Sequence, residues 1–360
     1  MHVRAMYDKR EESTKGKNGV DMIDLRTTYM GIPLRNPIIV GASPLTADMD
    51  SITMIEAMGA GALVTHSLFE EQIQLERFAF DEAIHKEDGR TAEAISFAPN
   101  LEHGGPLEHL MWVKKAKEAV NIPVIASLNA VNRETWIDYA KRLEETGVDG
   151  LECNLFACPT DPQKEAGTIE EEQIELIKEL KKTLSIPLSV KLSFFYTNPL
   201  NVIHRMDKTG VAAFVLFNRL LEPDINVNDE TSCHPLNLSH ATDYRLPLRY
   251  TGLLEGTIKA DICSSTGIYS GKDVAKMILA GATAVQTVSA LLHHTCFHIQ
   301  PLLKHLEGWM EQRGYDTLSA FRGKLSRRHT RDPWAYTRNQ YVDLLMGPLD
   351  ITNTPSCRKD

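Results

Sequence analysis

The sequence has no hydrophobic run long enough for a membrane span. Its apolar stretches fall well short of the roughly 18 to 20 residues that a transmembrane helix needs. Residues 1–20 are polar and charged and lack the apolar core of a signal peptide, so we expect a disordered N-terminal segment. These absences predict a protein that works in the cytoplasm, without a membrane partner.

Cysteine is also scarce. The chain has six cysteines without paired spacing, which is typical of reduced thiols in a cytosolic protein. Cys153 and Cys158 are five residues apart, but no second pair or nearby histidine completes a zinc or iron–sulfur set. We therefore predict no metal.

Cations are outnumbered by acids. The formal net charge is -9 and the pI is about 5.8, whereas nucleic-acid binding demands clustered Lys and Arg. A dinucleotide-binding fingerprint is missing as well. The composition argues against nucleic acid as the main partner and leaves a small molecule as the expected ligand.

What the sequence does contain is a repeated phrase, in which a helical pattern ends in glycine and a short apolar run follows. Glycine provides the left-handed C-cap that stops a helix, and continuous apolar runs suit strands buried on both faces. A variant of the phrase uses proline, which is tolerated at the start of a strand. The eight predicted strands lie within residues 37–41, 59–64, 121–126, 147–151, 185–190, 210–215, 260–263 and 281–285. With helical patterns between most of them, they predict an α/β fold of the (β/α)8 TIM barrel type, with an open doubly wound sheet as the alternative.

The chain is longer than the roughly 250 residues of a typical barrel, and the surplus has identifiable places. We predict a barrel domain over residues 21–330 and a C-terminal extension over residues 331–360, within a largely helical tail that starts near residue 301. Residues 67–109 and 219–245 are long insertions after the second and sixth strands. Active-site loops lie at that end of a barrel.

Two turns late in the chain have the features of phosphate-binding loops. Ser270 and Asp273 form a capping-box pattern that opens a helix, whose free amides and positive dipole end favour an anion. Gly267 and Gly271 permit a close backbone approach. The second turn, residues 288–290, follows the eighth strand, and barrels commonly bind phosphate after strands seven and eight. The alternative is an ordinary glycine-capped turn.

Five polar residues end or follow consecutive predicted strands. They are His66, Asn129, Asn154, Lys191 and Asn218, at strands two to six. Because the carboxyl ends of barrel strands converge on one pocket, we expect these side chains to meet there. For Lys191, a salt bridge within the barrel and a Schiff-base lysine are the other interpretations.

Several phrases resemble the dihydroorotate dehydrogenase family, in particular its soluble class 1 branch and the proteins described as dihydroorotate dehydrogenase-like. The similarity runs from about Asp24 to Gly323 and begins with a β-hairpin from Leu25 to Leu34. The other phrases are Asn36-Pro37, Gly41-Ala42-Ser43, Val190-Lys191-Leu192, Thr266-Gly267-Ile268, Gly271-Lys272-Asp273, Trp309-Met310-Glu311, Gly314-Tyr315 and Phe321-Arg322-Gly323. In combination these motifs are fairly specific for the family, although each is weak alone.

The resemblance implies an FMN-dependent oxidoreductase that acts on CH–CH donors and converts dihydroorotate to orotate in pyrimidine biosynthesis. Lys191 would lie beside flavin N1 and O2, where a fixed cation stabilises the negative charge of the reduced ring, so it is predicted to be catalytic as well. The residues that would bind FMN are Ala42, Ser43, His66, Asn129, Asn154, Lys191, Gly267, Gly271 and Ser289, with the phosphate held by Gly267, Gly271 and Ser289. The barrel domain would therefore be an FMN-binding domain.

The resemblance also implies a catalytic base. In this family a base deprotonates a substrate C–H bond while hydride passes from the adjacent carbon to flavin N5. The class 1 base is a cysteine after strand four, in the phrase Asn-Leu-Ser-Cys-Pro-Asn. Residues 154–160 of this chain read Asn-Leu-Phe-Ala-Cys-Pro-Thr, one residue longer, which makes Cys158 the candidate base and an inert loop thiol the alternative.

The substrate half departs from the family pattern. The predicted substrate-binding residues are Asn100, Thr160 and Asn218, but Thr160 replaces a family asparagine, and His66 stands where the family has a lysine. Unmatched polar groups in a buried site are costly, so such changes alter specificity. Two hypotheses follow: a true dihydroorotate oxidase, and a flavin oxidoreductase for a different small substrate.

A third hypothesis is a lyase in which Lys191 forms a Schiff base and the two glycine turns hold the substrate phosphate. For a flavin enzyme, the electron acceptor is left open between fumarate, oxygen, a quinone and a partner protein. Class 1 relatives are often homodimers, so a homodimer is the candidate assembly.

Overall fold

The predicted barrel is confirmed. The computed structural model describes residues 23–74, 106–156, 159–219, 222–332, 334–338, 342 and 346. Its eight barrel strands are β3 (Ile38–Val40), β4 (Ala62–Val64), β6 (Val124–Asn129), β7 (Gly150–Leu155), β8 (Leu188–Leu192), β9 (Ala213–Leu216), β12 (Asp261–Ser265) and β13 (Ala284–Thr287). Neighbours in this order pair in parallel, and β13 pairs with β3 to close the ring.

The barrel strands are short apolar runs, as their burial requires. Every residue of β3, β4, β9 and β13 is buried. A parallel sheet is covered on both faces, so its strands read as continuous rather than alternating hydrophobic sequence. This is why the apolar runs after glycine predicted strand positions correctly.

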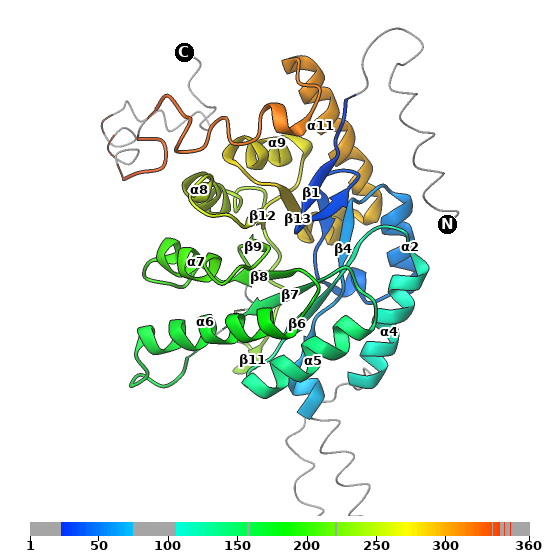
Figure 1. The fold of residues 1–360 in the computed structure, drawn as a ribbon, viewed down its shortest axis with the longest axis vertical. Helices are drawn as coiled ribbons and strands as arrows, with labels where there is room; N and C mark the ends of the chain where they lie inside the picture. The colour runs from blue at the N-terminus through cyan, green and yellow to red at the C-terminus, as the bar shows by residue number, and fades with distance from the viewer. Residues whose placement is uncertain are drawn as a thin grey trace, which may run out of the picture.

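Helices form an outer layer around the strands (Figure 1). They are α2 (Met49–Ala57), α4 (Pro106–Ala119), α5 (Arg133–Glu145), α6 (Ala166–Thr183), α7 (Pro199–Asp207), α8 (Arg245–Leu254), α9 (Gly271–Ala280), α10 (Ser289–His294) and α11 (Ile299–Arg313). In α5, the buried residues Trp136, Tyr139, Ala140 and Leu143 recur at helical spacing. One stripe of the helix therefore faces the core while the rest stays polar.

The N-terminal hairpin is confirmed and closes the amino end of the barrel. It consists of β1 (Thr27–Tyr29) and β2 (Ile32–Leu34), which pair antiparallel. Its buried residues Tyr29 and Met30 share a core cluster with residues of the barrel strands. The Met30 amide donates to Asp261 Oδ2 at 2.8 Å, at the first residue of β12. The opposite, carboxyl end is therefore the end that a ligand can reach.

The described parts of both predicted insertions follow strands at that carboxyl end. The first contains β5 (Leu68–Phe69), which pairs with the end of β6. The second contains the two-stranded sheet of β10 (Asp224–Asn226) and β11 (Thr231–Cys233) before it returns to α8. Both insertions can therefore contribute walls to a site at the strand ends.

The C-terminal segment packs on the barrel helices. After α11 the chain forms the short 3-10 helix η4 (Leu318–Ala320) and a series of turns. The Leu325 amide donates to Leu279 O in α9, and the Arg327 amide donates to Gly252 O in α8. These contacts hold the described part of the segment against the barrel. The domain boundaries at residues 20 and 330 stay predictions.

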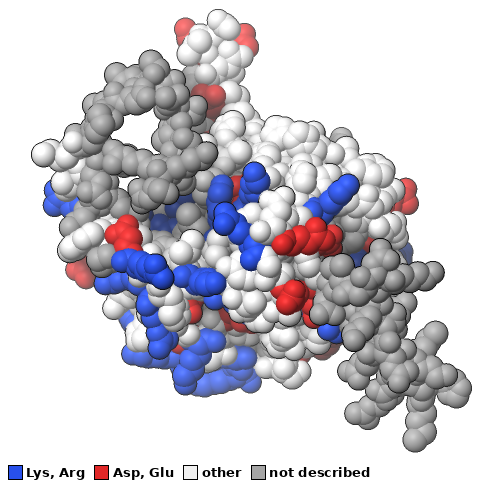
Figure 2. Space-filling view, turned by 90° about the horizontal axis from the view of Figure 1, so that it is seen from above, with Lys and Arg blue, Asp and Glu red and all other residues white. Residues whose placement is uncertain are grey.

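Two further observations concern the outside of the molecule. On the face in Figure 2, Lys and Arg gather toward one side, with Asp and Glu among them, beside a broad uncharged area. In the part of the chain that the structure describes, no helix combines the length and the apolar character that crossing a membrane requires.

Candidate active site

The structure places the five strand-end residues at or just after the carboxyl ends of their strands, and it brings Asn154 next to Lys191 and Asn218. Asn129 is the last residue of β6, Asn154 and Lys191 are partners in the β7–β8 ladder, and Asn218 follows β9. The Asn218 amide donates to Leu192 O at 2.8 Å, which extends the β8–β9 pairing beyond the strands. The sheet register therefore sets their places, and we call this end the barrel mouth.

Lys191 lies at the centre of a buried polar triad inside the barrel. Its ammonium donates to Gln286 Oε1 at 3.1 Å and lies 3.5 Å from Glu152 Oε1, with only 8% of the Lys191 side chain exposed. Gln286 Nε2 in turn donates to the other oxygen of Glu152. The salt bridge expected as an alternative is thus present, and the ammonium still has a donor with no partner among the described residues.

Asn154 and Asn218 face each other across the mouth. Asn218 Nδ2 donates to Asn154 Oδ1 at 2.9 Å. Both residues are half-buried. This bond occupies the oxygen of Asn154, so its own NH2 group is the part left to meet a ligand.

The turn after β3 contains the predicted residues Ala42 and Ser43. Ser43 Oγ is buried and has no hydrogen-bond partner among the described residues, while the Ser43 amide donates to Thr46 Oγ1 at 3.2 Å. A side chain on Gly41 would approach Val288 to 2.9 Å, so glycine is required where these two turns meet. A buried hydroxyl without a partner is costly unless a ligand supplies one.

His66 lies between the turn after β3 and helix α4. Its Nδ1 is 3.2 Å from Thr46 O. Its ring makes edge contacts with His109 and Trp112, with ring centroids 4.4 Å and 4.5 Å apart. Burial, with a smaller contribution from His66, lowers the pKa of His109 to about 3. His66 therefore stands beside an uncharged imidazole.

The predicted capping box at the start of α9 is confirmed. The Ser270 hydroxyl accepts from the Asp273 amide at 3.3 Å, and the Ser270 amide donates to Asp273 Oδ2 at 3.0 Å. Gly271 makes a different close approach from the one expected, because an added Cβ would lie 2.4 Å from Leu306 N in α11. Gly271 thus permits the packing of α9 on α11.

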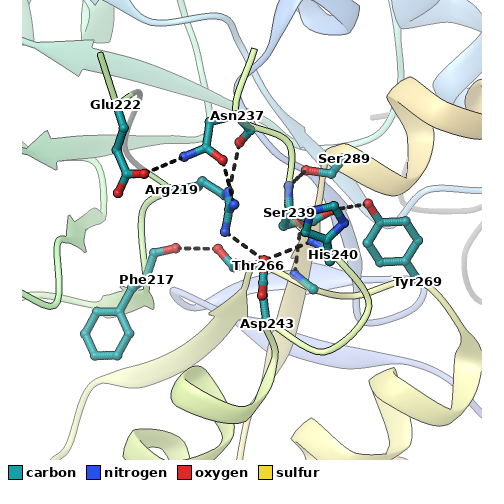
Figure 3. Close-up of polar contacts among 11 residues, drawn as sticks. Phe217, Arg219, Glu222, Asn237, Ser239, His240, Asp243, Thr266, Tyr269 and Ser289 are labelled. Atoms are coloured by element: carbon teal, nitrogen blue, oxygen red, sulfur yellow. Dashed lines mark hydrogen bonds and ion pairs between the residues drawn. The ribbon is translucent and has the colours of Figure 1, made fainter. Parts of the chain in front are cut away.

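Ser239, in the second insertion, joins the two predicted phosphate turns. Its amide donates to Ser289 Oγ at 2.9 Å, and its hydroxyl accepts from the Gly267 amide at 3.3 Å. Tyr269 donates its hydroxyl proton to Ser239 O. Figure 3 shows Ser239, Ser289 and Tyr269 pointing toward one another. Ser239 is buried, and the side chains of both Ser239 and Ser289 hydrogen-bond with Tyr269.

Arg219 holds the segment that contains Ser239. Its Nε and Nη2 donate to the backbone and side-chain oxygens of Asn237 at 2.8 Å and 2.7 Å, and its Nη1 contacts Asp243 Oδ2 at 2.7 Å (Figure 3). Asp243 also accepts from the His240 amide at 2.9 Å. The sequence marked residues 219–245 only as an insertion, because no local pattern joins an arginine to partners about 20 residues away.

The structure describes only some of the remaining predicted site residues. Cys158 and Asn100 lie outside the described residues, and Thr160 is exposed. Cys153 and Cys263 are buried in the barrel, and burial raises the pKa of both thiols. Within the described ranges, no three His, Cys, Asp or Glu residues are grouped to hold a metal ion.

Comparisons with known proteins identify the family of this sequence. The family described as dihydroorotate dehydrogenase matches residues 24–310. The catalytic subunit of dihydroorotate dehydrogenase B (NAD(+)) from Thermoplasma acidophilum is 28% identical over 278 residues, covering 75% of this chain and 88% of that protein. The same subunit from Thermoplasma volcanium is 27% identical over 316 residues, covering 85% and 100%. The chloroplastic dihydropyrimidine dehydrogenase (NADP(+)) of Arabidopsis thaliana is 23% identical over 326 residues, covering 83% and 76%.

Proposed function

The chain belongs to the dihydroorotate dehydrogenase family, and on that premise we propose that it binds FMN and oxidises a CH–CH bond of a small substrate. The observation that carries the proposal is the state of Lys191. A buried ammonium at the end of β8, paired with Glu152 and Gln286 but with a donor to spare, is suited to an electron-rich ring.

The residues at the mouth fit this cofactor. The buried Ser43 hydroxyl lacks a partner, and the NH2 group of Asn154 is turned away from its bond with Asn218. We assign the isoalloxazine to Ala42, Ser43, His66, Asn129, Asn154 and Lys191, and the phosphate to Gly267, Gly271 and Ser289. Bound FMN would supply the hydride acceptor.

Ser239 adds a hydroxyl to the phosphate end. The hydroxyls of Ser239 and Ser289 are suited to an anion, since each Ser hydroxyl can donate one hydrogen bond. The bond from the Ser239 amide to Ser289 Oγ supports this assignment because it uses only the acceptor side of Ser289. Gly271 contributes through its amide at the first turn of α9, where the helix dipole favours negative charge.

Different side chains would have different roles in the reaction. Lys191 stabilises negative charge that develops beside it, and the Glu152 carboxylate and the Gln286 amide hold the ammonium in place. Asn154 and Asn218 orient each other. Cys158 stays our candidate for the base that removes the substrate proton, because it is the thiol that the family phrase places after strand four.

Two alternative substrates are proposed. The family supports dihydroorotate, with orotate as product. A different small substrate is supported by His66, which packs against His109 and Trp112 where the family has a lysine. A charged lysine and a histidine in such a contact cannot bind the same substrate group in the same way.

Two measurements test the function. The purified protein should be yellow and should release FMN on denaturation, and dihydroorotate should then reduce the bound flavin. A yellow protein that saturating dihydroorotate leaves oxidised would support the flavin enzyme with another substrate. A colourless protein that cannot be reconstituted with FMN, but forms a covalent adduct on borohydride reduction with a carbonyl substrate, would instead support a Schiff-base lyase at Lys191.

A further inference from the structure

Residues 324–332 and 334–338 of the C-terminal segment cross the end of helix α8. The Arg327 amide donates to Gly252 O at 2.9 Å, and a side chain added to Gly252 would overlap the ring of Tyr336. The Tyr336 hydroxyl donates to Leu325 O, which ties the two stretches together. Helix α8 ends shortly before β12 begins, so this surface lies toward the amino end of the strands and away from the barrel mouth.

Exposed arginines gather on this surface. Four are in the segment itself, and one lies on α8, three residues before Gly252 and therefore on the same side of the helix. We call this group the basic surface, and its members are Arg249, Arg327, Arg328, Arg331 and Arg338. None of the five side chains forms a hydrogen bond or ion pair with a residue that the structure describes. A cluster of unpaired cations on a chain with a net charge of -9 is suited to an anionic partner.

The acids beside the basic surface are occupied by other groups. Glu255 Oε2 accepts from Ser326 Oγ at 2.8 Å and lies 3.7 Å from His329 Nδ1. Asp332 Oδ1 accepts from the Trp334 amide at 2.8 Å. Both carboxylates therefore help to fix the fold of the segment, and the arginines keep their charge for a partner outside the described chain.

Two large apolar side chains stand among these arginines. Leu325 and Trp334 are each 51% exposed. Leu325 precedes Arg327 by two residues, and Trp334 lies in the turn between Arg331 and Arg338. Arginine interspersed with exposed tryptophan and leucine is the composition of surfaces that rest in the headgroup layer of a membrane.

We propose that the basic surface docks on an anionic phospholipid membrane, with its arginines on lipid phosphates and with Leu325 and Trp334 in the headgroup layer. Leu325 favours lipid over nucleic acid, because an aliphatic side chain offers a base no stacking face whereas acyl chains accept it. The contact is peripheral and requires no spanning helix. It departs from the expectation of a protein without a membrane partner, and it does not depend on the proposed flavin chemistry.

The test is co-sedimentation of the full-length protein with vesicles of phosphatidylcholine alone, or of phosphatidylcholine and phosphatidylserine in equal parts. We expect binding to the vesicles that contain phosphatidylserine, which weakens as salt is added, and little binding to phosphatidylcholine. Tryptophan emission should shift to shorter wavelength on binding. Trp334→Phe should remove most of that shift, because Trp334 is the indole that enters the headgroup layer.

The charge requirement has a matched control. Arg327→Gln/Arg331→Gln should weaken vesicle binding about 25-fold, from roughly fivefold for each arginine. Lys114→Gln/Lys115→Gln removes two exposed cations from α4 and changes the net charge equally, but should alter vesicle binding by less than about twofold. Arg331→Gln/Arg338→Gln replaces the first variant if that one lowers the melting temperature.

The apolar requirement is tested in the same way. Leu325→Ser should weaken vesicle binding severalfold, because a polar side chain gains nothing from entering the headgroup layer. Leu107→Ser is its control, since Leu107 is 59% exposed on α4 and should leave vesicle binding unchanged.

Three results would overturn the proposal. The first is no binding to vesicles that contain phosphatidylserine. The second is equal weakening by Lys114→Gln/Lys115→Gln, because net charge alone would then explain the binding. The third is tighter binding of single-stranded polyuridylate than of these vesicles, with the same loss in Arg327→Gln/Arg331→Gln, which would assign the basic surface to nucleic acid.

Discussion

Two clusters near the mouth have the same composition, a cation, a carboxylate and an amide, but they use their hydrogen bonds differently. Lys191 forms one hydrogen bond to Gln286 and a 3.5 Å ion pair with Glu152. Arg219 spends all three guanidinium nitrogens on Asn237 and Asp243 at 2.7 to 2.8 Å. The lysine thus keeps a buried donor for a ligand, whereas every guanidinium nitrogen of the arginine already has a partner in the second insertion.

The difference teaches how to separate a functional cation from a structural one. The Lys191 cluster is buried among barrel strands, where an unused donor would be costly without a ligand. The Arg219 cluster is half-exposed and ties the second insertion to the end of β9. We infer that the first acts on the ligand directly, and that the second acts by holding Ser239 over the phosphate turns.

The largest effect is expected from removing the Lys191 charge. Lys191→Met should lower turnover by about 10²- to 10³-fold, as the loss of one preorganised electrostatic contact does in other enzymes. Because Met would leave Glu152 buried without its cation, the double variant Lys191→Met/Glu152→Gln should restore stability without restoring turnover. Steady-state kinetics and thermal melting measure the two effects.

Lys117→Met is the matched control for this variant. Lys117 pairs with Asp149 at 2.6 Å on the outer layer of the barrel, and its loss should leave turnover within about twofold. Full activity in the Lys191 double variant would break the comparison, since Lys191 would then be as structural as Arg219.

A smaller effect is expected from weakening the Arg219 clamp. Arg219→Lys keeps the charge but loses the guanidinium fork, and should lower the free energy of unfolding by about 1 to 3 kcal/mol. Flavin affinity should fall with it, because Ser239 loses its support, while the turnover of flavin-saturated enzyme stays near normal. Urea unfolding and flavin titration measure these quantities.

Arg142→Lys is the control for the clamp. Arg142 forms an exposed pair with Asp138 within α5, for which a change of a few tenths of a kcal/mol is expected. If flavin affinity falls in Arg219→Lys but not in Arg142→Lys, the structural role of Arg219 at the flavin site is supported. A turnover loss as large as that of Lys191→Met would contradict the structural role of the arginine.

His109 extends the comparison to a buried polar group with no charged partner, and its effect depends on pH. Its pKa is about 3 in the folded protein and about 6.5 when unfolded. The unfolded state therefore binds the proton first as pH falls, so stability is present above pH 6.5 and is lost between that pH and pH 3. Between pH 7 and pH 5 the loss from this group should be about 2 kcal/mol.

His109→Phe should reduce that pH dependence while keeping a ring against Trp112. Urea unfolding of both proteins at pH 7 and pH 5 provides the test. Identical pH dependence in the two proteins would show that His109 titrates freely and is not held neutral by burial.

The sequence predicted the barrel more completely than the site. Short apolar runs, four of them after a glycine and two around a proline, located all eight strands, because a strand buried on both faces leaves a local signal. Strand-end positions likewise located Asn154, Lys191 and Asn218 at one mouth. Neither Arg219 nor Ser239 was found, because their partners lie in different segments of the chain and no spacing rule connects them.

Gly271 is a residue whose role the sequence predicted only in part. Its place in a glycine-rich turn suggested room for an anion, but the space that it opens is filled by α11. A glycine indicates that something comes close, and only the packing of distant helices decides what that is.

By itself, the sequence determined the barrel, the end at which its polar residues gather, and membership of a family, because each of these depends on patterns within short stretches of chain. Only the tertiary structure decided which donors are spent and which are free. Lys191 and Arg219 are both cations near one mouth, and their local sequence does not show which of their donors find partners. Their difference arises from the groups that folding brings within hydrogen-bond distance, and that distance depends on the whole barrel.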